Sequence, residues 1–162
     1  MGAPEPMTQL ASLEREAVMA SWDDIQNFVA HEGQRLLQAG PALYKLRLAT
    51  EELLSNVIRY ATRGASETKP TVHLSLTFFR GTLQGKPALI LQLEDNGPAF
   101  DPQLDKKREI DKSEPILERP IGGLGLFLVQ QSVDHVDYAW HHQRNRYRLF
   151  VLLPESTRAA SP

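Results

Sequence analysis

An apolar stripe in residues 41–64 limits the fold more than any other feature of this chain. In the stretch "PALYKLRLATEELLSNVIRYATRG", small and apolar side chains recur at helical spacing, at Leu43, Leu46, Thr50, Leu53, Val57 and Ala61. Pro41 is typical of a helix start and Gly64 of a helix end, so one long helix is predicted here. A helix with one apolar face must cover a second layer of structure, which the rest of the chain has to provide.

Two pairs of strand patterns predict that second layer. The stretch 71–80 alternates between apolar and polar residues, with one face formed by Val72, Leu74, Leu76 and Phe78. The apolar stretch 86–95 follows after the short connection "GTLQG", so the two stretches predict a hairpin. A second hairpin is predicted from "HVDYAWHHQ" and "RYRLFVLLP" near the end of the chain.

Three weaker signals complete the order of elements. A short strand is expected near Leu10–Val18, and residues 21–40 predict a helix with Ser21 as its N-cap and Gly40 as its end. The glycine-rich loop in "IGGLGLFLV" leads into a third helix. The order of strand, two helices, hairpin, helix and hairpin predicts an α+β two-layer sandwich, in which helices cover one face of a mixed or antiparallel sheet.

The whole pattern fits one domain, expected over residues 10–154, with disordered ends at 1–9 and 155–162. The polar stretch from Gln103 to Pro120 has no core pattern and is too long for an ordinary connection. A functional lid is therefore predicted at about 101–122.

Composition excludes several classes of function. The net charge of −2 gives no electrostatic reason to expect nucleic acid or an anionic membrane as the main partner. The absence of cysteine excludes disulfides and thiolate metal sites, and it fits a reducing compartment. No apolar run approaches the roughly 20 residues of a membrane span, and no signal peptide begins the chain, so a cytoplasmic protein is expected.

Glu52 and Asn56 are the first candidates for chemistry. They lie four residues apart on the predicted long helix and therefore share a face at the edge of its apolar stripe. An amide oxygen is a hard ligand for Mg²⁺, and a carboxylate can accept a proton from a nucleophile. Taken alone, a Glu-x-x-x-Asn pair is more typical of a solvated helix face.

Two glycine-containing stretches supply further candidates. In "LEDNGPAFDP", Asp95 follows an apolar strand and could accept a hydrogen bond from an amino-bearing heterocycle, while Gly97 leaves room for the ring. Before the third helix, Gly122, Gly123 and Gly125 could present backbone N–H groups to an anion. A decorated turn and a tight helix entry are the respective alternatives.

Together, these three stretches resemble the GHKL ATPase superfamily, and within it the anti-sigma-factor serine kinases of the RsbW and SpoIIAB type. "LATEELLSNVIRYA" is similar to the N box of these proteins, "LEDNGPAFDP" to their first glycine box and "ERPIGGLGLFLVQQSVDHVDY" to their second. The resemblance spans roughly Leu46 to Leu153 and implies a Bergerat ATP-binding fold.

The resemblance also implies a role for each candidate. Glu52 is expected to be the general base and Asn56 the ligand of the Mg²⁺ that bridges the ATP phosphates. Asp95 is expected to bind the adenine amino group beside Gly97. The remaining nucleotide-binding positions that the resemblance implies are Phe100, Asp101, Arg119, Gly122, Gly123, Leu124 and Gly125. For Arg119, a solvated lid charge is the alternative.

One position departs from the superfamily pattern. Many members have a threonine in the last strand near the adenine, where "RNRYRLF" offers Tyr147 and Arg148 instead. The adenine side of the site is therefore where this chain is expected to differ.

The function implied is that of an ATP- and Mg²⁺-dependent protein serine/threonine kinase in a partner-switching system. Its expected partners are a STAS-domain anti-anti-sigma protein, which it phosphorylates, a sigma factor or other client, and a second copy of itself. The alternative is a nucleotide-gated binding module with little or no phosphoryl transfer. A histidine kinase is disfavoured because no helical hairpin with a phosphoacceptor histidine precedes the domain, and a gyrase-like machine because no transducer domain follows.

Overall fold

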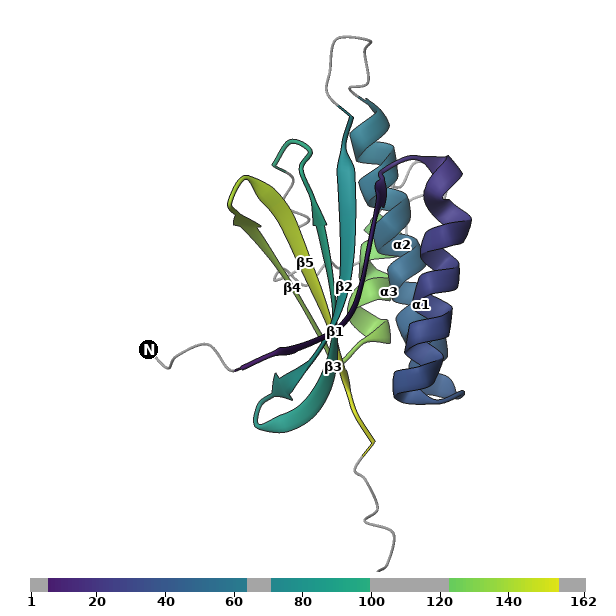
Figure 1. Ribbon diagram of the computed structural model, residues 1–162, viewed down its shortest axis with the longest axis vertical. Helices are drawn as coiled ribbons and strands as arrows, with labels where there is room; N and C mark the ends of the chain where they lie inside the picture. Colours follow the sequence, from purple (N-terminus) through teal and green to yellow (C-terminus); the bar gives the residue numbers. More distant parts are fainter. Residues whose placement is uncertain (1–5, 64–70, 100–122, 155–162) are drawn as a thin grey trace, which may run out of the picture.

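The computed structural model describes residues 6–63, 71–99 and 123–154 (Figure 1). Its elements in chain order are β1 (Thr8–Glu16), the short 3-10 helix η1 (Met19–Ser21), α1 (Trp22–Leu37), α2 (Pro41–Arg63), β2 (His73–Leu83), β3 (Lys86–Asp95), α3 (Gly123–Ser132), β4 (His135–His141) and β5 (Arg144–Leu152). The order of strands, helices and hairpins is the one that the sequence predicts.

The five strands form one sheet in the order β1-β2-β3-β5-β4, and every neighbouring pair is antiparallel. The prediction of a mixed or antiparallel sheet is thus confirmed in its antiparallel form. The two hairpins, β2–β3 and β4–β5, join through the pairing of β3 with β5. This pairing places the end of β3 beside the start of β5, although the two lie some fifty residues apart in the chain.

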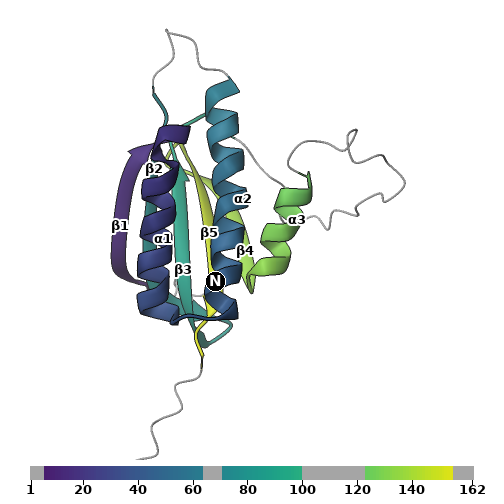
Figure 2. The same ribbon diagram turned by 90° about the vertical axis from the view of Figure 1, so that its right-hand side faces the viewer.

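All three helices cover the same face of the sheet (Figure 1). Seen from the helix side, α2 lies between α1 and α3, with α1 over the β1 half of the sheet and α3 beside β4 (Figure 2). The architecture is the predicted α+β two-layer sandwich.

The core forms between the helices and the facing side chains of the sheet. Leu74, Leu76 and Phe78 of β2 are all buried, as their alternation predicts. The rings of Phe78 and Phe28 of α1 lie 5.6 Å apart between centroids. Thr50 fits into the apolar stripe of α2 because its buried hydroxyl donates a hydrogen bond of 2.7 Å to the Leu46 carbonyl of the same helix.

The ends of the first elements differ from prediction. Strand β1 begins at Thr8, inside the stretch expected to be disordered, because residues 8–16 pair with β2. Ser21 makes no side-chain cap hydrogen bond to α1, since it already belongs to the turn of η1. Helix α1 ends at Leu37, three residues before the Gly40 that was expected to end it, and Gln38 has a positive φ of 62°.

The predicted lid at 101–122 and the tail at 155–162 lie outside the described residues. Within the described part of the chain, no helix combines the length and the hydropathy needed to span a bilayer.

Candidate functional site

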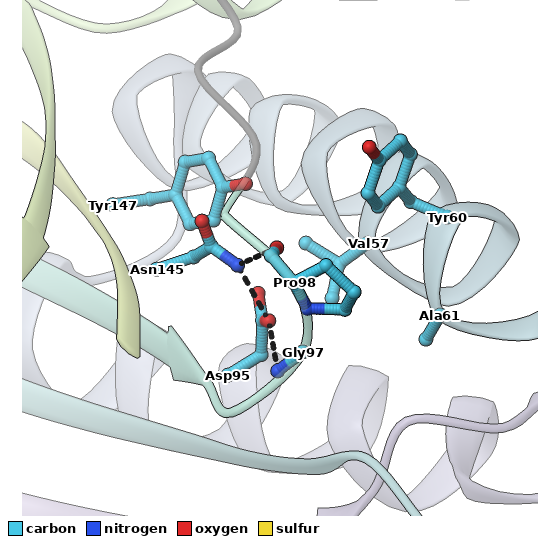
Figure 3. Close-up of a pocket in the computed structure, with 8 residues that line it drawn as sticks. All are labelled: Val57, Tyr60, Ala61, Asp95, Gly97, Pro98, Asn145 and Tyr147. Carbon is cyan, nitrogen blue, oxygen red and sulfur yellow. Dashed lines mark hydrogen bonds between the residues drawn. The ribbon is translucent and has the colours of Figure 1, made fainter. Parts of the chain in front are cut away.

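A pocket lies where the C-terminal half of α2 faces the end of β3 and the start of β5 (Figure 3). The loop of residues 96–99 that leaves β3 forms one of its walls. The residues that line the pocket are Val57, Tyr60, Ala61, Asp95, Gly97, Pro98, Asn145 and Tyr147. It combines apolar walls with a few convergent polar groups, which is typical of small-molecule sites.

Asp95 supplies a buried carboxyl group to this pocket. It is the last residue of β3 and only 5% exposed. Its Oδ1 atom accepts a hydrogen bond of 2.9 Å from the Gly97 N–H and another of 2.9 Å from the Asn145 amide nitrogen. Burial raises the pKa of the Asp95 carboxyl, and the two hydrogen bonds oppose that rise. The fold therefore holds a carboxylate at the pocket although its desolvation is unfavourable.

Gly97 is required here by the carboxylate of Asp95. A Cβ atom at position 97 would lie 3.0 Å from Asp95 Oδ1 and 3.6 Å from both methyl groups of Val72. A side chain at this position would thus press on the oxygen that the Gly97 N–H binds. The sequence predicts that Gly97 leaves room for a ligand ring, and the structure adds that it leaves room for Asp95 itself.

Asn145 is a site residue that the sequence analysis missed. It is 2% exposed and lies directly opposite Asp95 in the pairing of β3 with β5. Its amide nitrogen donates to Asp95 Oδ1 and, over 2.8 Å, to the Pro98 carbonyl (Figure 3). Its amide oxygen accepts a hydrogen bond of 2.6 Å from the Tyr138 hydroxyl of β4.

A signal for Asn145 is present in the sequence. In "RNRYRLF", arginines alternate with Asn145, Tyr147 and Leu149, so the asparagine shares the inward face with two core residues. The contact with Asp95 itself depends on strand register, which this alternation does not reveal.

The two residues expected in place of the threonine lie on opposite faces of the sheet. Tyr147 is 2% exposed, lines the pocket, and has its ring 5.2 Å from that of Tyr138. Arg148 points to the other face, where its Nε atom donates a hydrogen bond of 2.8 Å to Gln92. Tyr147 is therefore part of the pocket wall and Arg148 is not.

Glu52 and Asn56 lie on α2 outside the pocket lining, and both are half-buried. With Tyr60, which does line the pocket, they form a row of side chains spaced four residues apart on one face of the helix. At a rise of about 1.5 Å per residue, Asn56 lies about 6 Å and Glu52 about 12 Å along the helix axis from Tyr60. Hydrogen bonds and ion pairs to other described residues are absent for both side chains. Of these three side chains, only Tyr60 therefore lies at the pocket with Asp95, and Asn56 and Glu52 lie progressively further along the helix.

The remaining candidates fall near or outside the described residues. Phe100, Asp101, Arg119 and Gly122 lie outside them. Gly123, Leu124 and Gly125 are the first three residues of α3, which packs beside α2 (Figure 2). The prediction that all the glycines precede the helix is therefore wrong for Gly123 and Gly125, since backbone hydrogen bonding of helical type already includes them.

The model of the family described as "Histidine kinase-like ATPase domain" matches residues 16–150, from the end of β1 to Phe150 in β5. The chain belongs to this family. Its antiparallel sheet with helices on one face is the α+β Bergerat ATPase fold, and membership of an ATPase family implies that the domain binds ATP.

Relatives of this histidine kinase-like ATPase domain include proteins named "Serine-protein kinase RsbW". The chain is 31% identical to the one from Listeria monocytogenes serovar 1/2a over 98 residues, which are 59% of this chain and 57% of the relative. The one from Listeria innocua is 30% identical over the same lengths. The match thus spans a little over half of these relatives.

Proposed function

We propose that this protein is an ATP-dependent serine/threonine protein kinase and an anti-sigma-type regulator. The observation that carries the proposal is the buried Asp95 carboxylate, which faces a pocket in an ATPase-family domain while its Oδ1 atom is bound by two donors. The name of the relatives, serine-protein kinase, supports phosphoryl transfer as the reaction.

Asp95 recognises the base of the nucleotide in this proposal. A carboxylate is purely an acceptor, so it favours a ligand edge that carries an N–H group, such as the exocyclic amine of adenine. Val57, Ala61 and Tyr147 provide apolar wall around it. The base then lies at the end of α2 with its sugar and phosphates extending away from β3.

The row on α2 suits the phosphate end of the same nucleotide. Asn56 offers an amide oxygen that no other described residue engages, a donor type that Mg²⁺ accepts, so this residue fits the metal that the family implies. When bound, Mg²⁺ would neutralise part of the negative charge of the phosphates. Glu52, one turn further from the pocket, is placed beyond Asn56 on the same face, where the γ-phosphoryl end of an extended nucleotide is expected.

Glu52 acts as the general base of the transfer. The hydroxyl oxygen of the acceptor serine or threonine forms a bond to the γ-phosphorus, and the bond from that phosphorus to the β,γ-bridging oxygen breaks. The hydroxyl proton goes to the Glu52 carboxylate, and ADP carries the bridging oxygen away. The backbone N–H groups at Gly123 and Gly125 lie in the first turn of α3 and are proposed to contact the phosphates, together with Arg119 and Gly122.

We propose the partners that the resemblance to the anti-sigma-factor serine kinases implies. The acceptor is a STAS-domain anti-anti-sigma protein, the client is a sigma factor or another regulator, and the kinase acts as a homodimer. Phosphorylation adds close to two negative charges to the antagonist at its contact with the kinase, which weakens that complex and frees the kinase for its client.

The test is a phosphoryl-transfer assay with γ-labelled ATP, Mg²⁺ and a STAS-domain protein from the same genome. Wild type is compared with Glu52→Ala and Asn56→Ala, and with Glu51→Ala as a matched control on the same helix. We expect label on the STAS protein with wild type and Glu51→Ala, and its loss in the other two variants.

Two outcomes would contradict the kinase. If wild type binds ATP but transfers no label, the protein is a nucleotide-gated binding module. If Glu52→Ala retains full transfer, Glu52 is not the base.

A further inference from the structure

The polar groups around Asp95 form a chain that crosses three strands. Tyr138 of β4 donates to Asn145 of β5, and Asn145 donates to Asp95 at the end of β3. Asn145 and Asp95 are 2% and 5% exposed, and Tyr138 is half-buried. Buried polar groups arranged in this way hold one another in defined orientations, because any other arrangement leaves a group without a partner.

The orientation of the Asn145 amide follows from its neighbours. Its nitrogen lies 2.9 Å from Asp95 Oδ1 and 2.8 Å from the Pro98 carbonyl oxygen, and both of these atoms are acceptors. A flipped amide would place its own oxygen against both acceptors. The Tyr138 hydroxyl, 2.6 Å from the amide oxygen, further favours the observed orientation because it donates there.

The orientation of the Asp95 carboxylate follows in turn. Oδ1 accepts from both Asn145 and the Gly97 N–H, and these two donors use the lone pairs of that oxygen. No residue within the described ranges donates to Oδ2, and Asp95 lines the pocket. The carboxylate is therefore held by one oxygen while the other stays available as an acceptor for a ligand.

We propose that Asn145, held by Tyr138, is a positioning residue that directs Oδ2 of Asp95 at the ligand and so selects 6-aminopurine nucleotides over 6-oxopurine nucleotides. An adenine presents an N–H donor to this oxygen. An inosine base presents a carbonyl oxygen at the same position, which faces the carboxylate acceptor to acceptor. This inference rests on the proposed nucleotide function and assigns a part in base selectivity to Asn145 and Tyr138, to which the family resemblance gives no role.

The Pro98 contact gives Asn145 a second positioning effect. The same amide nitrogen binds the carboxylate and the backbone of the turn that contains Gly97 and Pro98. Carboxylate and turn are thereby held at a constant separation, which keeps the Gly97 N–H on Oδ1. Loss of the Asn145 side chain is expected to free both the Asp95 carboxylate and the Pro98 turn. Loss of the Tyr138 hydroxyl is expected to loosen only the Asn145 amide, which still binds both groups.

The test is calorimetric titration of the full chain with ATP and, separately, with inosine triphosphate. The two ligands share sugar and phosphates, so the ratio of their affinities reports on the base alone. The variants are Asn145→Leu, Tyr138→Phe and the double variant. Tyr44→Phe is the control, since it removes the same hydroxyl from a tyrosine that is 69% exposed on α2.

We expect wild type and Tyr44→Phe to prefer ATP by the same factor. Asn145→Leu should lower ATP affinity by about tenfold or more and leave the affinity for inosine triphosphate nearly unchanged. Tyr138→Phe should lower ATP affinity by about threefold to tenfold. The double variant should bind like Asn145→Leu alone, because Tyr138 acts through Asn145.

The outcomes separate this inference from the proposed function. If wild type binds neither nucleotide, the proposed function fails. If wild type prefers ATP and the variants keep its preference, or lose affinity for both nucleotides equally, the positioning role is refuted. Should Asn145→Leu fail to fold, as its thermal transition would show, the preference of Tyr138→Phe decides alone.

Discussion

Replacing Asp95 with asparagine should separate the binding role of this residue from its effect on stability. In Asp95→Asn, the side-chain oxygen is expected to keep both hydrogen bonds that Oδ1 now accepts, from Gly97 and from Asn145. The new NH₂ group then occupies the position of Oδ2. It faces the exocyclic amine of adenine donor to donor, so the contact that the carboxylate would make is lost.

The size of the binding loss follows from the hydrogen bond removed. A hydrogen bond to a charged group contributes about 1.5–3 kcal/mol, which corresponds to a factor of roughly ten to two hundred in affinity. We therefore expect ATP affinity to fall by about that factor, measured by calorimetric titration at neutral pH.

The free energy of unfolding should rise in Asp95→Asn, although the ATP affinity falls. Burial raises the pKa of Asp95 above its ordinary value of 3.8 in spite of two opposing hydrogen bonds. A carboxyl whose pKa is raised on folding contributes stability that is full below its unfolded pKa and is lost as the pH rises through the folded pKa. Ionisation of Asp95 therefore destabilises the fold, and a neutral asparagine at this position does not carry that cost.

Thermal unfolding of wild type and Asp95→Asn over a pH series from about 4 to 7.5 is the assay. The variant should melt at the same or a higher temperature at neutral pH, and the difference should shrink toward acid pH as Asp95 protonates. For a chain of this length, about 1 kcal/mol shifts the midpoint by roughly 2–4 °C, so a small gain is measurable. A variant that is clearly less stable than wild type at pH 7 would refute the reasoning, since it would mean that the hydrogen bonds to the charge outweigh its desolvation.

Three further substitutions test the packing of the site and the core. Gly97→Ala should weaken ATP binding severalfold in titrations because its Cβ meets Asp95 Oδ1 at 3.0 Å, and unchanged affinity would contradict this contact. Phe78→Ala should lower the free energy of unfolding by about 3–5 kcal/mol in a denaturant titration, since its ring is fully buried; a loss below 1 kcal/mol would be inconsistent with that burial. Gly33→Ala should change the same free energy by less than about 1 kcal/mol, because the gain in helix propensity opposes a 2.7 Å contact with the movable Cδ1 of Leu43, and a large loss would show that Leu43 cannot shift.

Much of the fold could be predicted from local patterns. The stripe of α2 and the alternation of β2 each repeat over several turns or pairs of residues, so their type and inward face follow from periodicity. Element ends were less predictable. Gln38 has a positive φ directly after α1, although it is not a glycine. Thr8 already pairs with β2, because the tertiary pairing outweighs the weak local signal at the chain start.

The residues of the candidate site also differ in how far the sequence predicts their positions. Glu52 and Asn56 could be placed on one face because a helix relates residues four apart by its own geometry. Asn145 could not be connected with Asp95, since no local rule fixes the register between strands from different hairpins. The missing threonine therefore pointed to Tyr147 and Arg148, of which only Tyr147 shares the inward face with Asn145.

The types of the elements, the shared face of Glu52 and Asn56 on α2 and the acid at the end of β3 could all be predicted from the sequence, because each depends on neighbours within one element. The contacts that hold this acid depend on the packed sheet. The pairing of β3 with β5 sets Asn145 opposite Asp95, and the pairing of β4 with β5 brings Tyr138 to Asn145. Hydrogen bonds of about 3 Å depend on the position of every strand between them, and that position is a property of the packed sheet.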